Sequence, residues 1–434
     1  MRTRRSPLWI PTTGAGASDW APSSRTCGCC AKLSRTSNSS GPAMPTAMHR
    51  WSPSTTGSAT RWSTRSSATS GSRKPEWGGA RKSIVGVTGI GQTERMDIVE
   101  FGPEDGELVS GAFEVLRAAH EFDIPEGPPP HWGVFEKSLA HPMPDEDSTS
   151  YVALRDGKVV GTFRTMFPNR ENKHFGMASL TVHPEHRRQG IGTSMLERFL
   201  QLARAESRTE VSLDTHVTWE DGPARSEAGA EFLKKHGFTL ALTSVNRRCL
   251  TDAMAPEDEQ TLMDKSVAAA GDEYEIISWT GRTPPELVDT MCRIDSMILS
   301  EVPLGELNLE PEVVDPELKE AKAVRNEALG VLPLQTVARH RASGEVVANT
   351  ILGVFDDTEY TDGFQWITIV DPAHRGHRLG TLIKLVNLRL LREQHPHVRR
   401  IWTDNADVNA HMIDINVKMG FESVDALAEM QRKI

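Results

Sequence analysis

A segment that reads strand, glycine-containing turn and helix occurs twice in this 434-residue chain, and it restricts the fold more than any other feature. The first copy spans residues 177–205 and contains the turn HPEHRRQGIG. The second spans residues 364–392 and contains DPAHRGHRLG. The apolar run before each turn favours a buried strand, and the residues after it place apolar side chains on one helical face. The two turns are 188 positions apart, so the repeat has the length of a whole domain.

The turn between strand and helix is suited to hold an anion. Such a connection aims backbone N–H groups and the positive end of the helix dipole at one point. Glycines let a bulky anion approach the main chain, and arginines add positive charge. The first copy contains Arg187, Arg188, Gly190 and Gly192 in this stretch. We therefore predict a pyrophosphate-binding turn, here called a cradle, in each copy.

The spacing Arg-x-x-Gly-x-Gly, after a strand ending in Leu-x-Val, resembles the acyl-CoA-binding motif of the GCN5-related N-acetyltransferases (the GNAT superfamily). The resemblance implies an α/β fold with a mixed sheet splayed around the cofactor, two tandem GNAT domains, and acetyl-CoA as co-substrate. The tandem arrangement is also similar to that of the mycothiol synthases. In the second cradle Arg378 stands where glycine is expected, so it could crowd the pyrophosphate or pair with it.

The resemblance also assigns cofactor contacts residue by residue. Those in the first copy are Leu180, Val182, Arg187, Arg188, Gln189, Gly190, Gly192 and Thr193. Those in the second copy are Val370, Arg375, Gly376, His377, Arg378, Gly380, Thr381, Asn405 and Asn409. Asn405 has an alternative interpretation as the N-cap of the last helix.

The acid and base of such a reaction are less evident. A tyrosine that often protonates the departing thiolate in this family is replaced by Leu233 in the first copy and by Asn416 in the second. As bases we predict Asp214 and His216 in the first copy and Asp404 in the second, since each lies on the strand after a predicted cradle helix. The alternative is that these are solvated residues at strand ends.

The sequence predicts a domain over residues 96–250, an acidic and partly helical linker over 251–272 and a second domain over 273–434. In each domain a helix and an antiparallel hairpin precede the cradle, and a strand, a helix and a final strand follow it. Helices are expected at 108–122, 224–236, 284–299 and 410–419, and residues 301–327 form a polar, acidic stretch.

Residues 1–95 differ sharply from the rest. They contain 14 Lys and Arg against 3 Asp and Glu, whereas the whole chain has a net charge of −10, so residues 96–434 carry −21. This segment has 30 Ser and Thr but only 7 Leu, Ile, Val and Phe, too few to offset chain entropy by burial. We predict disorder and favour a start site assigned too early. A basic nucleic-acid-binding arm and a transit-like leader are the alternatives.

The expected function is transfer of an acetyl group from acetyl-CoA to a primary amine of a small molecule. The alternative is an acyl-CoA-binding or regulatory module without turnover, which the two missing tyrosines favour. The acidic charge favours cationic amines over nucleic acid as partners. No metal site is expected, because Cys27, Cys29 and Cys30 have no further ligands at suitable spacing. Single cysteines, together with the lack of a secretory or membrane segment, predict a cytoplasmic protein with no membrane partner.

Overall fold

The computed structural model describes residues 85–86, 96–220 and 222–434, all within one compact unit. Its strands are β1 (Val85–Gly86), β2 (Met96–Phe101), β3 (Glu146–Arg155), β4 (Lys158–Pro168), β5 (Phe175–Val182), β6 (Glu210–Val217), β7 (Thr239–Leu250), β8 (Tyr274–Thr280), β9 (Val331–His340), β10 (Val346–Phe355), β11 (Asp362–Val370), β12 (Arg400–Ala406) and β13 (Glu422–Lys433). Its helices are α1 (Gly106–Asp123), α2 (Trp132–Ala140), α3 (Ile191–Ala205), α4 (Ala228–Lys235), α5 (Pro256–Ala270), α6 (Val288–Ser296), α7 (Ile298–Glu301), α8 (Pro316–Leu329), α9 (Leu379–Gln394) and α10 (Ala410–Lys418). Short 3-10 helices are η1 (Pro184–His186), η2 (Pro285–Leu287) and η3 (Pro372–His374).

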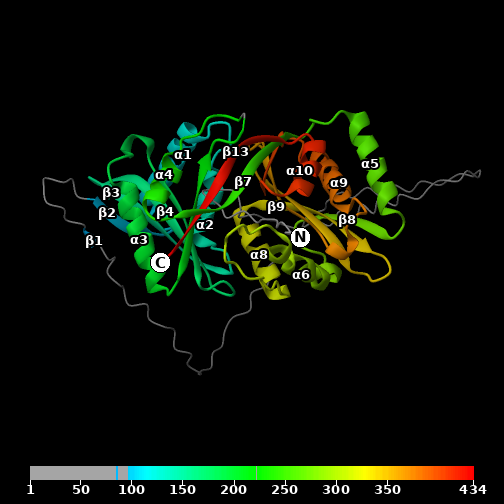
Figure 1. Cartoon of the computed structure of the whole chain (residues 1–434), viewed down its shortest axis with the longest axis horizontal. Helices are drawn as coiled ribbons and strands as arrows, with labels where there is room; N and C mark the ends of the chain where they lie inside the picture. The colour runs from blue at the N-terminus through cyan, green and yellow to red at the C-terminus, as the bar shows by residue number, and fades with distance from the viewer. Residues whose placement is uncertain (1–84, 87–95, 221) are drawn as a thin grey trace, which may run out of the picture. The chain divides into compact units, whose positions relative to one another are not determined.

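The described strands form one continuous sheet in the order β1-β2-β3-β4-β5-β6-β13-β7-β12-β11-β10-β9-β8. We call residues 96–250 the N-terminal half and residues 273–434 the C-terminal half. The last strand of each half pairs with the other half: β13 pairs with β6, and β7 pairs with β12. Figure 1 shows β13, in red, crossing towards the half that contains β3 and β4. Each half is therefore completed by a strand of the other. The predicted domain ranges, 96–250 and 273–434, stay a prediction.

In both halves a parallel strand pair comes apart after a short ladder. The paired residues are Phe175–Met177 with Glu210–Ser212, and Asp362–Phe364 with Arg400–Trp402. Beyond them β5 no longer pairs with β6, and β11 no longer pairs with β12. Where no ladder joins the two strands, a strand edge can offer backbone donors and acceptors to another extended chain. The predicted mixed, splayed sheet is confirmed, once in each half.

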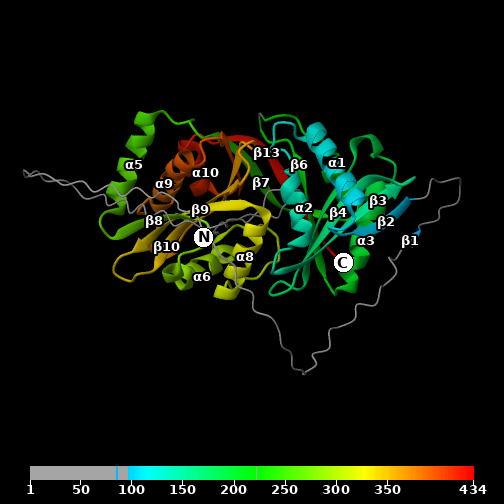
Figure 2. The same ribbon diagram turned by 180° about the vertical axis from the view of Figure 1, so that it is seen from behind.

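Helices cover both faces of this sheet. Alternate residues of β9 show the two layers, since Leu334 and Ala338 pack in the cluster that contains α9, whereas Val337 packs with Met291 of α6. Figure 2 shows α5, α9 and α10 on one side of this part of the sheet and α6 and α8 on the other. In the N-terminal half, α3 buries Met195, which packs with the strands in a second large core. Each splay therefore has its cradle helix firmly anchored beside it.

Three stretches differ from the sequence-based expectation. Residues 251–272 are mostly the helix α5, whose buried Glu259 bonds to both Arg389 and Arg392 of α9, so this segment is packed and does not merely link. The polar stretch 301–327 contains most of α8, which the sequence pattern did not reveal because α8 buries only Leu318, Arg325 and Leu329. The helix expected from residue 224 begins at Ala228. The predicted disorder of residues 1–95, like Cys27, Cys29 and Cys30, lies outside the described residues, apart from β1, which pairs with β2.

Candidate active site

Both cradles have the same backbone course. Arg188 and Gly190 lie in the left-handed region, with φ of 64° and 84°, and the matching residues Gly376 and Arg378 have φ of 91° and 54°. The turn thus requires two left-handed residues, and each copy supplies one glycine and one arginine. The arginine at 378 therefore leaves the turn intact, and its side chain is exposed rather than crowding the turn.

The cradle helices begin without side-chain caps. No side-chain hydrogen bond caps α3, which follows Gly190, or α9, which follows Arg378. The first N–H groups of a helix otherwise lack partners, and together with the helix dipole they attract an anion. Near the start of α3, the Thr193 hydroxyl lies 3.3 Å from Nε2 of His236. The amide of Gln189 donates to the carbonyl of Glu185 at 3.3 Å.

Arg187, which stays a predicted pyrophosphate contact, has a structural partner in the protein. Its guanidinium forms a bidentate ion pair with Asp123 at the end of α1, with N–O distances of 2.7 and 2.5 Å. Its Nε donates to the carbonyl of Val182 at 3.1 Å. Arg187 thereby ties α1 to the end of the central strand. For Arg188 no ion pair is found within the described part of the chain, which makes Arg188 the better candidate for an anion.

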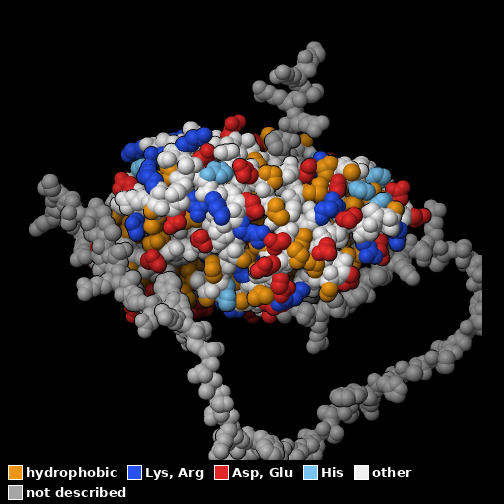
Figure 3. Space-filling view, turned by 90° about the horizontal axis from the view of Figure 1, so that it is seen from below, with side chains coloured by type: hydrophobic (Ala, Val, Ile, Leu, Met, Phe, Trp, Pro, Cys, Tyr) orange, Lys and Arg blue, Asp and Glu red, His pale blue; other side chains and the backbone are white. Residues whose placement is uncertain are grey.

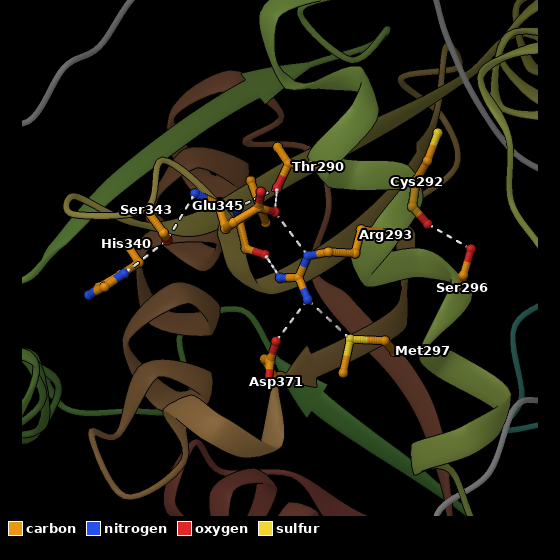
Figure 4. A network of polar contacts seen from close by, with 10 residues as sticks. Thr290, Cys292, Arg293, Ser296, Met297, His340, Ser343, Glu345 and Asp371 are labelled. Atoms are coloured by element: carbon orange, nitrogen blue, oxygen red, sulfur yellow. Dashed lines mark hydrogen bonds and ion pairs between the residues drawn. The ribbon is translucent and has the colours of Figure 1, made fainter.

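An ion pair also ties the C-terminal cradle to the first helix of its half, but here the arginine lies on the helix and the carboxylate lies in the cradle. Arg293 of α6 donates to Asp371 at 2.9 Å, to Glu345 at 2.9 Å and to the carbonyl of Val346 at 2.7 Å, as Figure 4 shows. Burial raises the pKa of Asp371, but the hydrogen bonds from Arg293 and the N–H of Ala373, together with the charge of Arg293, hold it below its ordinary value. This network fixes η3 against the β9–β10 hairpin.

The other predicted anion ligands of the C-terminal cradle also have contacts of their own. Arg375 donates to Glu301 at 2.6 Å. The ring of His377 packs beside Tyr274, with 5.4 Å between the ring centroids. A phosphate that took these side chains as ligands would have to displace those contacts.

The two cradles also differ in access. Gly192 and Thr193 of α3 are partly exposed, whereas Gly380 and Thr381 of α9 are buried. A Cβ at Gly380 would lie 3.4 Å from Ile415 of α10. Leu180 and Val182 on β5 and Val370 on β11 are partly exposed at the ends of the central strands, where the resemblance places them. The N-terminal splay is thus the more open of the two at its helix start.

A buried charged cluster lies beside the N-terminal splay. His216 of β6 places Nδ1 3.2 Å from Oδ2 of Asp425, which belongs to the exchanged strand β13. The same carboxylate accepts from Nε of Arg225 at 2.7 Å and from the amide of Asn246 at 2.6 Å. Arg225 also forms an ion pair with Glu126 at 3.0 Å. The side chain of Asp425 is only 4% exposed, whereas that of His216 is 31% exposed.

This arrangement fixes the protonation pattern of His216. Burial raises the pKa of Asp425, but the hydrogen bond and charge of His216, with help from Asn246 and Arg225, hold it below its ordinary value, so Asp425 is ionised. A carboxylate has no hydrogen to donate, so Nδ1 of His216 must carry one. In the neutral imidazole Nε2 is then left with a lone pair, which is the form a general base requires.

The C-terminal half lacks this arrangement. Asp404 and Ala406 occupy the positions on β12 that Asp214 and His216 occupy on β6, counted from the start of each parallel ladder. Ala406 is fully buried in a cluster with Leu307. Burial raises the pKa of Asp404 to about 7, and its buried Oδ2 has no hydrogen-bond partner among the described residues.

A polar chain fills the space between α9 and α10. Lys384, which is 2% exposed, donates to Asn416 at 2.9 Å, and Asn416 donates to Asn405 at 2.5 Å. Burial lowers the pKa of Lys384 to about 7. Asn409, not Asn405, caps α10 by accepting from the N–H of Met412, so the capping interpretation of Asn405 is wrong.

The two positions that lack the family's tyrosine both lie in packed interior. Leu233 belongs to the core around α3 and is 3% exposed, and Asn416 is fully buried. Neither side chain can protonate a thiolate. Among the described residues there is no cluster of His, Cys, Asp and Glu that could hold a metal ion, and no helix is long and apolar enough to span a membrane.

Comparison with known proteins agrees with this geometry. Residues 112–238, which include β5, the first cradle and α3, match the Acetyltransferase (GNAT) family. A tandem GNAT protein from the clavulanic acid biosynthesis pathway is 25% identical, with a TM-score of 0.65 over 78% of this chain and 98% of that one. Residues 112–238 thus match a GNAT domain, and the chain has the fold of a tandem GNAT protein. No curated protein matches it significantly.

Two further solved structures share the fold of this tandem GNAT protein. A GCN5-related glucosamine N-acetyltransferase region of a fungal β-N-acetylglucosaminidase is 16% identical, with a TM-score of 0.53 over 81% of this chain and 38% of that one. A GCN5-related N-acetyltransferase from Sphaerobacter thermophilus is 13% identical, with a TM-score of 0.51 over 78% and 95% of the two chains. The family match and the tandem GNAT protein support acyl transfer in general. None of the comparisons shows the expected likeness to mycothiol synthases.

Sequence reasoning missed the partners of His216. Asp425 is 209 residues away along the chain and lies in no motif, and Arg225 lies in the connection after β6. Only the pairing of β13 with β6 brings Asp425 to this site. A pattern search within one domain could not have found it.

Proposed function

We propose that this tandem GNAT protein transfers an acetyl group from acetyl-CoA to a primary amine of a small molecule, and that the N-terminal half performs the transfer. One observation carries the proposal: a partly exposed His216 borders the open N-terminal splay, whereas the matching residue of the C-terminal half is the buried Ala406. A cytoplasmic location remains a prediction.

The proposed binding mode follows from the unpaired edges and the first cradle. The pyrophosphate of acetyl-CoA would bind the uncapped N–H groups at the start of α3. Arg188 of the turn, for which no ion pair is found among the described residues, would add positive charge. The pantetheine arm would run along the edge of β5 beyond Met177, where the strand has no partner on the β6 side. A backbone N–H near Leu180 would then face the developing oxyanion of the thioester.

The chemistry needs one base and a correctly placed amine. Nε2 of His216 would take a proton from the ammonium group, and the neutral amine would attack the thioester carbon. The new C–N bond forms as the C–S bond breaks. The nitrogen loses its second proton as the amide forms, and the CoA thiolate takes up a proton from solvent, because no tyrosine stands at position 233.

The charge around the site favours a cationic acceptor. Asp214, Asp425 and Glu126 contribute three carboxylates, and Arg225 contributes one cation. The face drawn in Figure 3 intersperses acidic and basic side chains over its described residues, unlike the continuous basic surface that nucleic acid requires. A small amine therefore remains the proposed partner.

The test is a thiol-release assay on the full chain with acetyl-CoA and a panel of primary amines, repeated with His216→Asn. We expect release of CoA thiol with at least one amine and a loss of roughly 100-fold or more in the variant, since general base catalysis contributes about 10²- to 10⁴-fold. Equal rates for both proteins would exclude His216 as the base. Binding of acetyl-CoA without thiol release from any amine would instead favour a binding or regulatory module.

A further inference from the structure

The structure assigns Asp425, on the strand that the C-terminal half contributes to the N-terminal half, as the positioning residue of His216. This inference rests on the proposed function, but its physical core is a contact that can be measured without turnover. It makes the two halves one catalytic unit, in which the C-terminal half completes a site that lies in the N-terminal half.

The exchanged strand gives this contact its geometry. Ala426 pairs with Val217 and Leu427 pairs with His216 along the β6–β13 ladder, so Asp425 lies diagonally across from His216. On its other side β13 pairs with β7, which places Asn246 directly opposite Asp425. Adjacent strands in a sheet bring such side chains within reach of each other. Asp425 thus receives one donor from each neighbouring strand.

The donors around Asp425 also hold it in place. Oδ1 accepts from Asn246, and Oδ2 accepts from Arg225 and from His216. A carboxylate fixed by three donors has little freedom to turn away, so it holds the imidazole ring in one orientation. Arg225 in turn forms an ion pair with Glu126 at 3.0 Å, so a second carboxylate holds the guanidinium in place.

The groups that can influence His216 come from several elements. They are Asp214 on the same strand, Asp425 on β13, Arg225 after β6, Glu126 after α1, and His120 of α1. Asp425 accepts a hydrogen bond from the ring of His216 at 3.2 Å. Replacement of its carboxylate is therefore expected to change the orientation and the tautomer of the ring.

The experiment reads the ring tautomer of His216 in the full chain by ¹⁵N NMR of selectively labelled histidine, with His216→Asn used to assign the signal. The native chain is expected to show the hydrogen on Nδ1, because the carboxylate of Asp425 can only accept. Asp425→Asn is expected to populate the tautomer with the hydrogen on Nε2, because an amide can donate to Nδ1 as well as accept from it. The matched control is Glu429→Gln, which removes another buried carboxylate from β13. Glu429 accepts a hydrogen bond from Ser212, and its variant is expected to leave the tautomer of His216 unchanged.

Turnover gives an independent reading. With the most active amine of the panel, Asp425→Asn is expected to lower kcat about tenfold or more, with Glu429→Gln close to the native protein. A tautomer of His216 that is the same in Asp425→Asn and the native chain would overturn the inference, even if His216 proves essential. A changed tautomer in a chain that releases no thiol would uphold the contact and refute the proposed function.

Discussion

Lys384 provides the most direct test of the energetics of the C-terminal half. It lies on α9 among apolar neighbours, is 2% exposed, and has Asn416 as its hydrogen-bond acceptor. The matching position of α3 in the N-terminal half is Leu196, which is fully buried. We expect Lys384→Met to stabilise the protein at neutral pH, because an apolar side chain of similar length avoids the burial of an amine.

The magnitude follows from the shift in pKa. Burial lowers the pKa of Lys384 from 10.5 to about 7, so the folded state disfavours the charged form that the unfolded chain prefers. Stability is therefore lost as pH falls from 10.5 towards 7 and is constant below that. At about 1.4 kcal/mol per unit, the loss is about 4 kcal/mol at pH 7 and about 1.5 kcal/mol at pH 9.5. The lost hydrogen bond to Asn416 reduces the gain by about 1 kcal/mol at every pH.

The assay is urea unfolding of Lys384→Met and the native chain at pH 7 and pH 9.5, followed by circular dichroism. The matched control is Lys265→Met on α5, where the lysine is exposed and the same change is expected to be near neutral at both pH values. The result that refutes the reasoning is a variant no more stable than the native chain at pH 7, or a gain of equal size at both pH values.

Three further predictions concern the turn, the buried carboxyl group and the strand exchange. Arg378→Gly is expected to raise the free energy of unfolding by about 1 kcal/mol, because a left-handed residue with a Cβ is strained, and Gly376→Ala is expected to lower it by a similar amount in the same denaturation assay. Asp404→Asn is expected to stabilise the protein by roughly 2 kcal/mol more at pH 8 than at pH 5, because a carboxyl group with a raised pKa destabilises the fold increasingly as pH rises towards 7. An effect on Tm that does not change with pH would contradict a buried carboxyl group that ionises in this range. Residues 96–272 and 273–434 produced as separate chains are expected to show no cooperative thermal transition as monomers, because each lacks the strand that completes its sheet, and a sharp transition for either would show that the exchange is dispensable.

Local patterns sufficed for the parts of the fold that depend on short stretches of sequence. The strand ending at Val182, the turn through Gly190 and the helix that buries Met195 could all be predicted, because apolar periodicity and turn chemistry act over a few residues. The repeat of the same motif around Arg375 then predicted the strand, turn and helix of the second copy. Helix α8 escaped because it is stabilised by long-range contacts, such as Arg325 with the carbonyl of His141, and not by an apolar stripe.

The candidate site was predictable only where the motif itself supplied it. His216 was found as a polar residue on a strand beside the splay, but its partner Asp425 depends on pairing between strands 209 residues apart. The ion pair of Arg187 with Asp123 could not be predicted for the same reason, since it is a tertiary contact that no spacing reveals. Long-range strand pairing and ion pairing decide these contacts, and they leave no local signal.

The most direct test of the account is the stoichiometry of acetyl-CoA binding to the full chain by calorimetry, compared between Arg188→Glu and Arg378→Glu. Each variant reverses the charge of the left-handed arginine in one cradle, and neither arginine has an ion pair among the described residues. The account predicts one acetyl-CoA per chain, with affinity reduced roughly 10- to 100-fold by Arg188→Glu, because a charge-assisted hydrogen bond contributes about 1.5–3 kcal/mol. Arg378→Glu is expected to leave the affinity unchanged. Binding that survives Arg188→Glu and is lost in Arg378→Glu would contradict the assignment of the N-terminal half as the acyl-CoA site.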